Sequence, residues 1–267
     1  LWYDKTGKRQ RVDWPDKLLR VRGRTVSQAW PAICRGIGMQ KYTVLGISLC
    51  DYGVREALRN TDGFLHSGGL NTVAYISGAI LAQASKEEDL KRCVERIDMT
   101  ICAEADVLEA VGIAGRNRVR EIDEQSYLRE LLRKLNRNRN SVYLLAETAE
   151  GLEGFKDIIT EYQENLFIRG CGAYEDFDRQ PERLVNALND LTPDVVISCM
   201  PWMGDFRLTY EYGQYVNAKL WVSLPLGIVN PIRKTSFFTG MSRRLKNRLF
   251  TKQVNEYNNS RKPGDGL

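Results

Sequence analysis

The sequence is short of the residues and motifs on which many enzymes depend. Its 267 residues include one histidine, His66. Any Ser-His or Cys-His catalytic pair would need this loop residue, which is more often a solvated side chain. The six cysteines are scattered without a CxxC pair, as is typical of free buried thiols. Neither GxGxxG nor GxxxxGK[ST] occurs, so a nucleotide would have to be held in another way.

Long apolar runs and clusters of metal ligands are also missing. No apolar stretch approaches the roughly 18 residues of a membrane-spanning helix, and the first residues lack the apolar core of a signal peptide. The carboxylates considered as a hard-cation site, Glu175, Asp176 and Asp178 in one loop, have the pattern of a solvated turn. We therefore expect a cytoplasmic protein without a metal or other cofactor.

Charge is nearly balanced overall but unevenly distributed. The net charge is +5, and the basic excess is concentrated between Lys5 and Arg24 and between Arg233 and Lys252. This distribution favours an anionic partner, either lipid headgroups or substrate phosphates. No helix-turn-helix, zinc-finger or ribonucleoprotein signature is present, so we do not expect a nucleic-acid partner.

Short apolar runs alternate with amphipathic stretches from Lys41 onward. The predicted strands are Tyr42–Leu49, Thr72–Ile76, Met99–Cys102, Val142–Leu145, Leu166–Gly170, Val195–Met200 and Leu220–Leu224. The predicted helices are Gly53–Asn60, Gly78–Ala84, Glu87–Ile97, Ala105–Ile113, Glu124–Asn136, Ala149–Tyr162, Pro181–Leu191 and Phe206–Asn217. Such alternation predicts an α/β fold, with a mostly parallel Rossmann-like sheet flanked by helices.

We divide the chain into three parts on this basis. Residues 1–40 form a basic N-terminal extension, residues 41–232 the α/β domain, and residues 233–267 a basic amphipathic C-terminal appendage. The order of strands and helices in the second half of the α/β domain resembles that of nucleotide-binding folds.

The segment from Asp98 to Asp123 carries the candidate chemistry. Glu104 and Asp106 follow a predicted strand and lie in the first turn of the next helix. In open α/β sheets, ligands bind at the carboxyl ends of the strands. Either carboxylate could act as a general base. The alternative is that both are helix-start acids stabilised by the helix dipole.

Several short motifs follow one another along the chain, and their serial order is more informative than any one of them. That order resembles the WecG/TagA/CpsF glycosyltransferases (family 26), which build bacterial surface polysaccharides, and it extends from about Tyr42 to Val254. The matching stretches are Val44–Ile47 with Val54–Ala57, Leu90–Asp98, Gly115, Arg118-Val119, Ile122-Asp123, Val142–Leu145, Ile168–Gly170 and Pro193–Val196.

The sequence departs from this family at the motifs that carry its chemistry. The family's T-P-N turn falls on Tyr75-Ile76-Ser77. Its P-D-G turn, whose Asp is the proposed base, falls on Cys102-Ala103-Glu104, so Ala103 takes the place of the Asp unless the alignment slides by one residue to Glu104. The P-K-Q-E turn becomes Pro201-Trp202-Met203-Gly204, and the late G-V-G-x-x-F-D segment has no Asp.

The resemblance implies transfer of an N-acetylhexosamine from a UDP-sugar to a polyprenyl-diphosphate-linked acceptor. Glu104 or Asp106 would then be the base, with substrate bound by Tyr75, Ser77, Arg118, Asp123 and Pro201. Arg118 suits a diphosphate, although a surface ion pair in this charged loop is the alternative. A second hypothesis is a catalytically inactive pseudoenzyme that acts as scaffold or regulatory partner of another glycosyltransferase subunit.

The C-terminal appendage contains a predicted amphipathic helix. Apolar residues share one helical stripe with basic residues beside it, a pattern of interfacial helices that sink into the headgroup region. The family's C-terminal appendage is likewise thought to dock on the membrane, so we predict peripheral association with the inner face of the cell membrane. The alternative is a helix packed on its own core. The predicted membrane-binding residues are Phe238, Met241, Arg243, Arg244, Leu245, Arg248 and Leu249.

Overall fold

The computed structural model describes residues 2–3, 9–10, 40–224, 250–252 and 254–257. The chain divides into two units, Leu1–Ala32 and Ile33–Leu267. In the first unit, the described residues form a short antiparallel pair of β1 (Trp2–Tyr3) and β2 (Arg9–Gln10). All remaining elements belong to the second unit.

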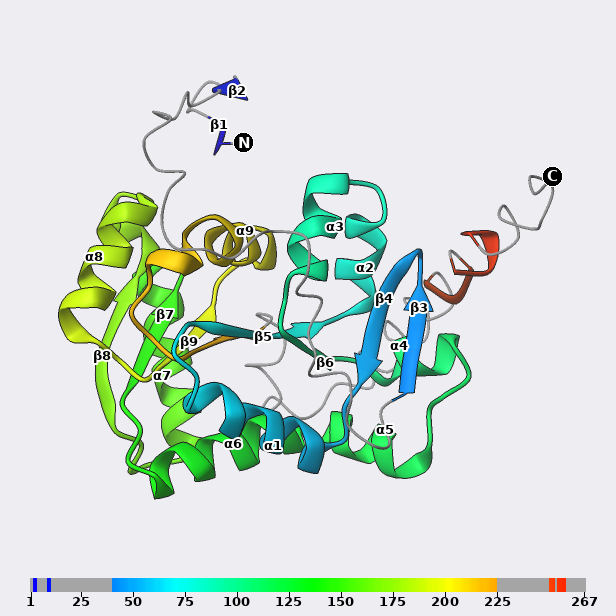
Figure 1. Ribbon diagram of the computed structural model, residues 1–267, viewed down its shortest axis with the longest axis horizontal. Coiled ribbons are helices and arrows are strands. Elements are labelled where there is room, and N and C mark those ends of the chain that lie inside the picture. The colour runs from blue at the N-terminus through cyan, green and yellow to red at the C-terminus, as the bar shows by residue number, and fades with distance from the viewer. Residues whose placement is uncertain (1, 4–8, 11–39, 225–249, 253, 258–267) are drawn as a thin grey trace. The chain divides into compact units, whose positions relative to one another are not determined.

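A six-stranded parallel sheet is the centre of the second unit (Figure 1). Its order is β6-β5-β10-β9-β7-β8, and every neighbouring pair is parallel. The sheet confirms the predicted Rossmann-like α/β fold. Its strands are β5 (Asn71–Ile76), β6 (Met99–Cys102), β7 (Val142–Ala146), β8 (Ile168–Ala173), β9 (Val195–Cys199) and β10 (Leu220–Ser223).

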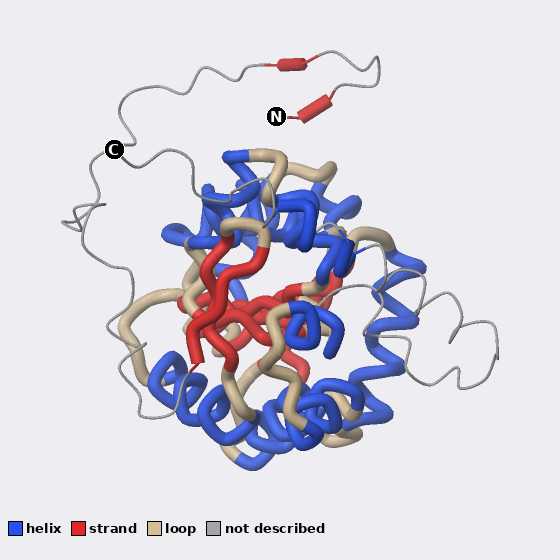
Figure 2. Tube along the Cα trace, turned by 90° about the vertical axis from the view of Figure 1, so that its right-hand side faces the viewer, coloured by secondary structure: helices blue, strands red, loops and turns tan. Residues whose placement is uncertain are grey.

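Helices cover both faces of this sheet, as Figure 2 shows. β7 and β9 are buried along their whole length, as expected for parallel strands covered on both sides. One core cluster joins one face of the sheet to α1 (Val54–Leu65), α6 (Ser126–Arg137) and α7 (Ala149–Tyr162). The opposite face packs on α2 (Gly78–Ala84), α3 (Glu88–Glu95), α8 (Pro181–Leu191) and α9 (Trp202–Tyr212).

The predicted single strand Tyr42–Leu49 is wrong. The chain instead forms an antiparallel hairpin of β3 (Gln40–Val44) and β4 (Ile47–Asp51). The two-residue turn uses Leu45 at φ 51° and Gly46 at φ 76°, the left-handed conformations that such hairpins need. Leu45 is buried, so the apolar pattern continues through the turn and conceals it. Gly46 was the residue in the sequence that could have indicated a turn.

Four short helices also occur in the second unit: α4 (Ala105–Ala110), α5 (Arg116–Asp123), η3 (Tyr174–Phe177) and η4 (Gly213–Tyr215). The described residues 250–252 and 254–257 are helical as well. The sequence indicated a loop where α5 forms. Ile122 is its only buried residue, so α5 lacks the apolar periodicity by which helices are recognised. The predicted acidic turn contains η3, where Glu175 accepts a hydrogen bond from the Ala149 N–H at 2.7 Å.

Several element boundaries also differ from the prediction; α1, for example, continues five residues beyond Asn60, to Leu65. β8 continues beyond Gly170, because Gly172 lets it approach β7 closely: a Cβ there would lie 2.4 Å from the Tyr143 hydroxyl. Glycine usually weakens a strand, so the sequence pattern ended too early. α9 begins at Trp202, with Pro201 as its N-cap, and ends at Tyr212.

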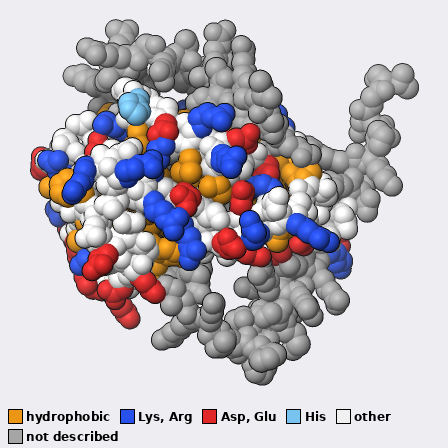
Figure 3. All heavy atoms as spheres, turned by 90° about the horizontal axis from the view of Figure 1, so that it is seen from below, with side chains coloured by type: hydrophobic (Ala, Val, Ile, Leu, Met, Phe, Trp, Pro, Cys, Tyr) orange, Lys and Arg blue, Asp and Glu red, His pale blue; other side chains and the backbone are white. Residues whose placement is uncertain are grey.

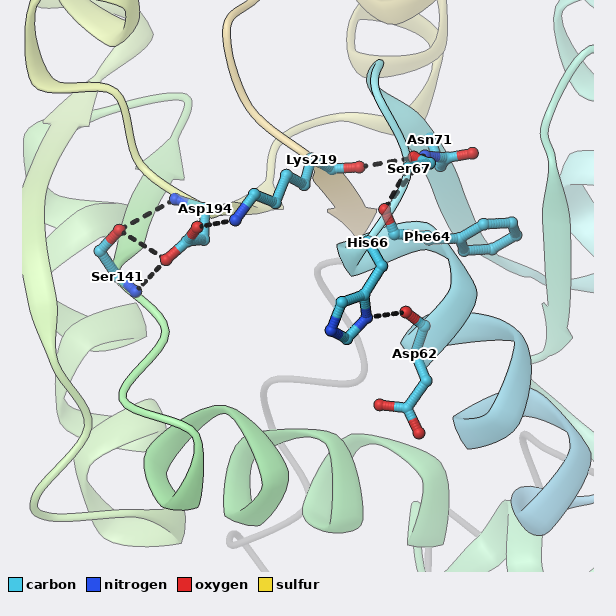
Figure 4. Close-up of polar contacts among 8 residues, drawn as sticks. All are labelled: Asp62, Phe64, His66, Ser67, Asn71, Ser141, Asp194 and Lys219. Carbon is cyan, nitrogen blue, oxygen red and sulfur yellow. Dashed lines mark hydrogen bonds and ion pairs between the residues drawn. The ribbon is translucent and has the colours of Figure 1, made fainter.

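Polar side chains join the strands at the edge opposite their carboxyl ends. Asp194 precedes β9 and accepts hydrogen bonds from the N–H and hydroxyl of Ser141 at 2.9 and 3.1 Å, while Lys219 pairs with it at 2.6 Å (Figure 4). Asp98 likewise accepts hydrogen bonds from the N–H and hydroxyl of Thr72.

His66 lies near this edge, and its Nδ1 bonds to the Asp62 carbonyl oxygen at 2.7 Å. The lone histidine is therefore remote from the carboxyl ends.

Candidate functional site

The carboxyl ends of the parallel strands lie along one edge of the sheet. Glu104 follows β6, Ser77 follows β5, Leu224 follows β10 and Pro201 follows β9. With about 4.8 Å between neighbouring strands, Glu104 and Pro201 are separated by three spacings, roughly 14 Å. The edge therefore brings together residues that are far apart in the sequence.

Glu104 and Ser77 meet at the start of α2. Oε2 of Glu104 accepts a hydrogen bond from the Gly78 N–H at 3.4 Å. The Ser77 hydroxyl caps the same helix by accepting from the Ile80 N–H at 3.3 Å. N–H groups at a helix start attract anionic oxygens. The exposed Glu104 carboxylate is thus held beside Ser77, at the edge where ligands of such sheets bind.

The turn beneath Glu104 contains a neutral thiol. Burial raises the pKa of Cys102 to about 12, and its Sγ donates to the Glu104 carbonyl oxygen at 3.0 Å. A thiol with this pKa is a poor nucleophile at neutral pH. Cys102 therefore shapes the turn, and the only acid–base group that this turn presents to solvent is Glu104.

Asp106 and Asp123 occupy neighbouring helices near this turn. Asp106 lies in the first turn of α4 and is half-buried, whereas Asp123 is the exposed last residue of α5. α4 and α5 pack on each other. The structure thus places both carboxylates on the elements that follow β6, and their predicted roles as base and substrate ligand stay predictions.

Arg118 forms an ion-pair cluster between α5 and the hairpin. Its Nε and one terminal nitrogen reach the two carboxylate oxygens of Asp51 at 3.0 and 2.6 Å, and the other terminal nitrogen pairs with Glu121. Burial lowers the Arg118 pKa, but Asp51 and Glu121 outweigh it, so the pKa lies above its usual value. Burial, together with the proximity of Cys102 and Asp51, raises the pKa of the nearby Tyr42.

Tyr75 lies in the core rather than at the surface of this edge. Its side chain is 3% exposed and packs against Tyr127 with ring centroids 6.2 Å apart. Its hydroxyl has no hydrogen-bond partner among the described residues. A direct contact between this side chain and a substrate would therefore require the core beneath β5 to rearrange.

The sequence analysis missed a buried carboxylate at the same edge. Asp205, in α9, is 1% exposed, and its Oδ1 accepts a hydrogen bond from the Trp221 indole at 3.1 Å. Oδ2 and the neighbouring Ser198 hydroxyl are buried, and neither makes a hydrogen bond of normal geometry within the described ranges, although Ser198 and Ser223 lie close enough to Asp205 to lower its pKa. The sequence does show a carboxylate shortly after the Pro201 turn. The predicted helix began at Phe206, so Asp205 was not recognised as a helical residue facing the core.

We predict that Asp205→Asn stabilises the protein at alkaline pH. Burial raises the pKa of Asp205 from 3.8 to about 6, against the opposing effect of Ser223, Ser198 and Trp221. Between these pH values the folded state binds more protons than the unfolded state, so the contribution of Asp205 to stability falls as pH rises. Above pH 6 the penalty is complete, on the order of 2–3 kcal/mol.

The amide in Asp205→Asn keeps the acceptor for Trp221 and directs its NH₂ toward the serine hydroxyls. The free energy of unfolding in urea, measured at pH 8 and pH 4, tests this prediction. The gain should be present at pH 8 and absent at pH 4. An equal effect at both values would contradict it.

Residues near the C-terminus reach the start of α2. Phe250 and Val254 are buried in the core cluster that contains α2, and a Cβ on Gly78 would lie 3.1 Å from the Phe250 ring. Gly78 thus allows Phe250 to pack beside the N–H that binds Glu104. The predicted membrane-binding residues, Phe238 to Leu249, lie outside the described residues.

Two kinds of feature are absent from the described residues. No group of three or more potential metal ligands occurs among them. Within the same ranges, no helix has the length and apolar character needed to cross a bilayer.

The chain matches a known family over the whole of this sheet. A profile described as the Glycosyl transferase WecG/TagA/CpsF family matches residues 42–224. The chain belongs to this family. The match begins in β3 and ends directly after β10, so it covers nearly all of the hairpin, the whole sheet, and the turns at Ser77, Glu104 and Pro201. No curated protein matches the chain.

Membership of the WecG/TagA/CpsF family makes the chain a glycosyltransferase-family protein of polysaccharide synthesis. At a coarse level, the family implies a sugar donor and a lipid-linked acceptor. These are substrates whose phosphates and hydroxyls call for cationic and carboxylate side chains.

Proposed function

We propose that the protein transfers an N-acetylhexosamine from a UDP-sugar to a polyprenyl-diphosphate-linked acceptor. The observation that carries the proposal is the placement of Glu104 beside Ser77 at the start of α2. This is an exposed carboxylate at the carboxyl edge of a parallel sheet, in the position that an acceptor-activating base needs.

In this reaction the acceptor hydroxyl gives its proton to Glu104 as its oxygen bonds to the anomeric carbon. The bond from that carbon to the diphosphate breaks, and UDP leaves with the electron pair. A positioned base contributes roughly 10²–10⁴-fold to such a rate. Asp106, on the next helix, is the alternative base.

Arg118 is the proposed ligand of the donor diphosphate. A guanidinium has five N–H donors, and the bonds to Asp51 and Glu121 use three of them. The remaining donors are available to phosphate oxygens, and the carboxylates fix the orientation of the group. Asp123 is proposed as a further substrate residue, and Tyr75 would join it only if the core beneath β5 rearranges.

Pro201 lies at a switch point of the sheet. β7 is followed by α7 on one face, and the adjacent β9 is followed by α9 on the other. In open α/β sheets, ligands bind where neighbouring connections diverge in this way. This position supports a donor site that extends from Pro201 toward Ser77.

Titration of the full chain with UDP and with UDP-N-acetylhexosamines tests the proposal. We expect saturable binding by calorimetry, and weaker binding in Arg118→Gln because one diphosphate contact is lost. Lys156→Gln, at an exposed ion pair with Glu153 on α7, is the charge-matched control and should bind normally. If no UDP compound binds, donor recognition is absent and the transferase proposal is wrong.

A catalytically inactive scaffold is the second candidate. Ala103 replaces the family's Asp, and Tyr75 is buried in the core, so two family positions cannot supply polar groups at the surface. The scaffold would bind an active glycosyltransferase subunit of polysaccharide assembly. Stable co-purification with such an enzyme, without turnover of UDP-sugars, would support it, and ordinary turnover by the isolated chain would exclude it.

Membrane attachment belongs to the proposal because the acceptor is lipid-linked. The predicted apolar and basic stripe from Phe238 to Leu249 is proposed to adhere to the inner face of the cell membrane.

A further inference from the structure

Exposed arginines gather on the outer surface of α1 and α6, which pack side by side. Figure 3 views this helical layer from outside and shows basic side chains across it. α1 and α6 bury their apolar residues toward the sheet. Residues on the opposite side of each helix, spaced about four apart in the sequence, therefore face outward. We call this set the arginine surface, and it consists of Arg55, Arg59, Arg129, Arg133 and Arg137, all of which are exposed.

The acidic residues of these two helices are Glu56, Asp62 and Glu130, fewer than the cations, so part of this charge is uncompensated. Asp62 pairs with Lys134, and Glu130 with Arg133. Within the described ranges, Arg55, Arg59 and Arg137 form no ion pair. Arg129 lies over the Tyr162 ring at 5.6 Å. Neighbouring cations without acidic partners favour an external anion.

The arginine surface has a sharp border. α7, the third helix of this layer, carries mainly acidic charges along its outer side, Glu150, Glu153, Asp157 and Glu161, and its one lysine, Lys156, pairs with Glu153. A planar anionic partner would therefore contact α1 and α6 while α7 tilts away from it. The charge pattern thus sets the orientation of the protein as well as its affinity.

We infer that the arginine surface docks on the anionic headgroups of a phospholipid leaflet. Guanidinium groups match phosphate geometry, and basic residues near an anionic leaflet each add to adhesion. The inference rests on the proposed function, because a lipid-linked acceptor is presented at such a leaflet. It places a membrane contact on α1 and α6 of the folded domain, in addition to the one predicted for the C-terminal stripe.

The arginine surface also adjoins the candidate site through the chain. α1 begins directly after the hairpin strand that ends at Asp51, and α6 begins directly after α5, which carries Arg118. Docking through α1 and α6 therefore holds the ion-pair cluster close to the leaflet. This arrangement would bring a membrane-anchored acceptor to the edge that contains Glu104.

Co-sedimentation of the full chain with vesicles tests the inference. Vesicles of phosphatidylcholine with about 30% phosphatidylglycerol supply the anionic surface, and phosphatidylcholine alone is the neutral control. The triple variant Arg55→Gln, Arg59→Gln, Arg137→Gln should partition into anionic vesicles on the order of 100-fold less, since each arginine contributes about fivefold. Raising salt should weaken wild-type binding.

Matched variants separate the surface from net charge. Lys86→Gln, Arg92→Gln, Arg183→Gln removes three exposed cations from the opposite side of the sheet and should bind as wild type. Glu153→Gln, Asp157→Asn, Glu161→Gln on α7 should bind more tightly. Equal losses in both cation variants, unchanged binding in the arginine variant, or wild-type affinity for neutral vesicles would overturn the inference.

Two further measurements distinguish a failure of the lipid inference from a failure of the proposed function. Binding of the wild type to duplex DNA but not to vesicles, lost in the arginine variant, would assign the surface to nucleic acid and overturn the lipid inference. Transfer to a detergent-solubilised acceptor does not require docking, so the arginine variant should keep that activity if the proposed function holds. Loss of donor binding in the wild type would instead reject the proposed function.

Discussion

Glu104→Gln is expected to lower turnover roughly 10²–10⁴-fold while leaving the affinity for UDP-sugar close to that of the wild type. Glutamine has the same length and keeps an oxygen that can accept from the Gly78 N–H. It cannot take a proton from the acceptor. The change therefore removes only proton transfer, which at 1.36 kcal/mol per decade corresponds to about 3–5 kcal/mol of barrier.

Steady-state transfer to a detergent-solubilised acceptor, together with UDP-sugar titration, measures both quantities. Asp106→Asn is the matched control, since it removes a carboxylate from the first turn of α4 and should retain turnover if Glu104 is the base. If Asp106→Asn is the slower variant, the roles are exchanged. Unchanged turnover in the double variant would show that neither carboxylate is the base.

The second large effect is expected from Asp51→Ala, which should cost about 3 kcal/mol of folding stability. Asp51 accepts two hydrogen bonds from Arg118, and the two side chains are only 13% and 19% exposed. Removing the carboxylate leaves a largely buried cation with Glu121 as its remaining partner. An uncompensated buried charge costs more than the loss of the pair as a unit.

Urea unfolding of the single and double variants provides the test. Asp51→Ala combined with Arg118→Met should be more stable than Asp51→Ala alone, because the double variant leaves no buried charge. Asp190→Ala, at an exposed position on α8, should change stability by less than about 0.5 kcal/mol. A loss below about 1 kcal/mol in Asp51→Ala would show that Arg118 readily finds solvent or another partner.

These two predictions divide the edge of the sheet into a chemical part and a supporting part. Glu104 lies on the turn after β6, and the cluster of Asp51, Arg118 and Glu121 joins the hairpin to α5. If Arg118 also binds the donor diphosphate, Asp51→Ala should weaken UDP binding as well as stability, because the guanidinium loses its orientation.

The sequence by itself determined the α/β alternation, the parallel sheet, the family, and the position of Glu104 and Asp106 after β6. Each of these follows from local periodicity or from the order of short motifs, and both are properties of neighbouring residues. The sequence also indicated Arg118 and Ser77, because both fall at motif positions of the family and because the guanidinium of Arg118 suits a diphosphate. It could not identify their partners.

Only the tertiary structure decided the rest. The hairpin turn at Leu45 is hidden because its leucine packs inward, α5 lacks an apolar face, and Tyr75 enters the core beneath α6. Arg118 is joined to Asp51, 67 residues away. Asp205 is joined to Trp221 in β10, the last strand of the sheet in sequence order. Such pairings depend on which segments the fold brings together, and no local pattern encodes them.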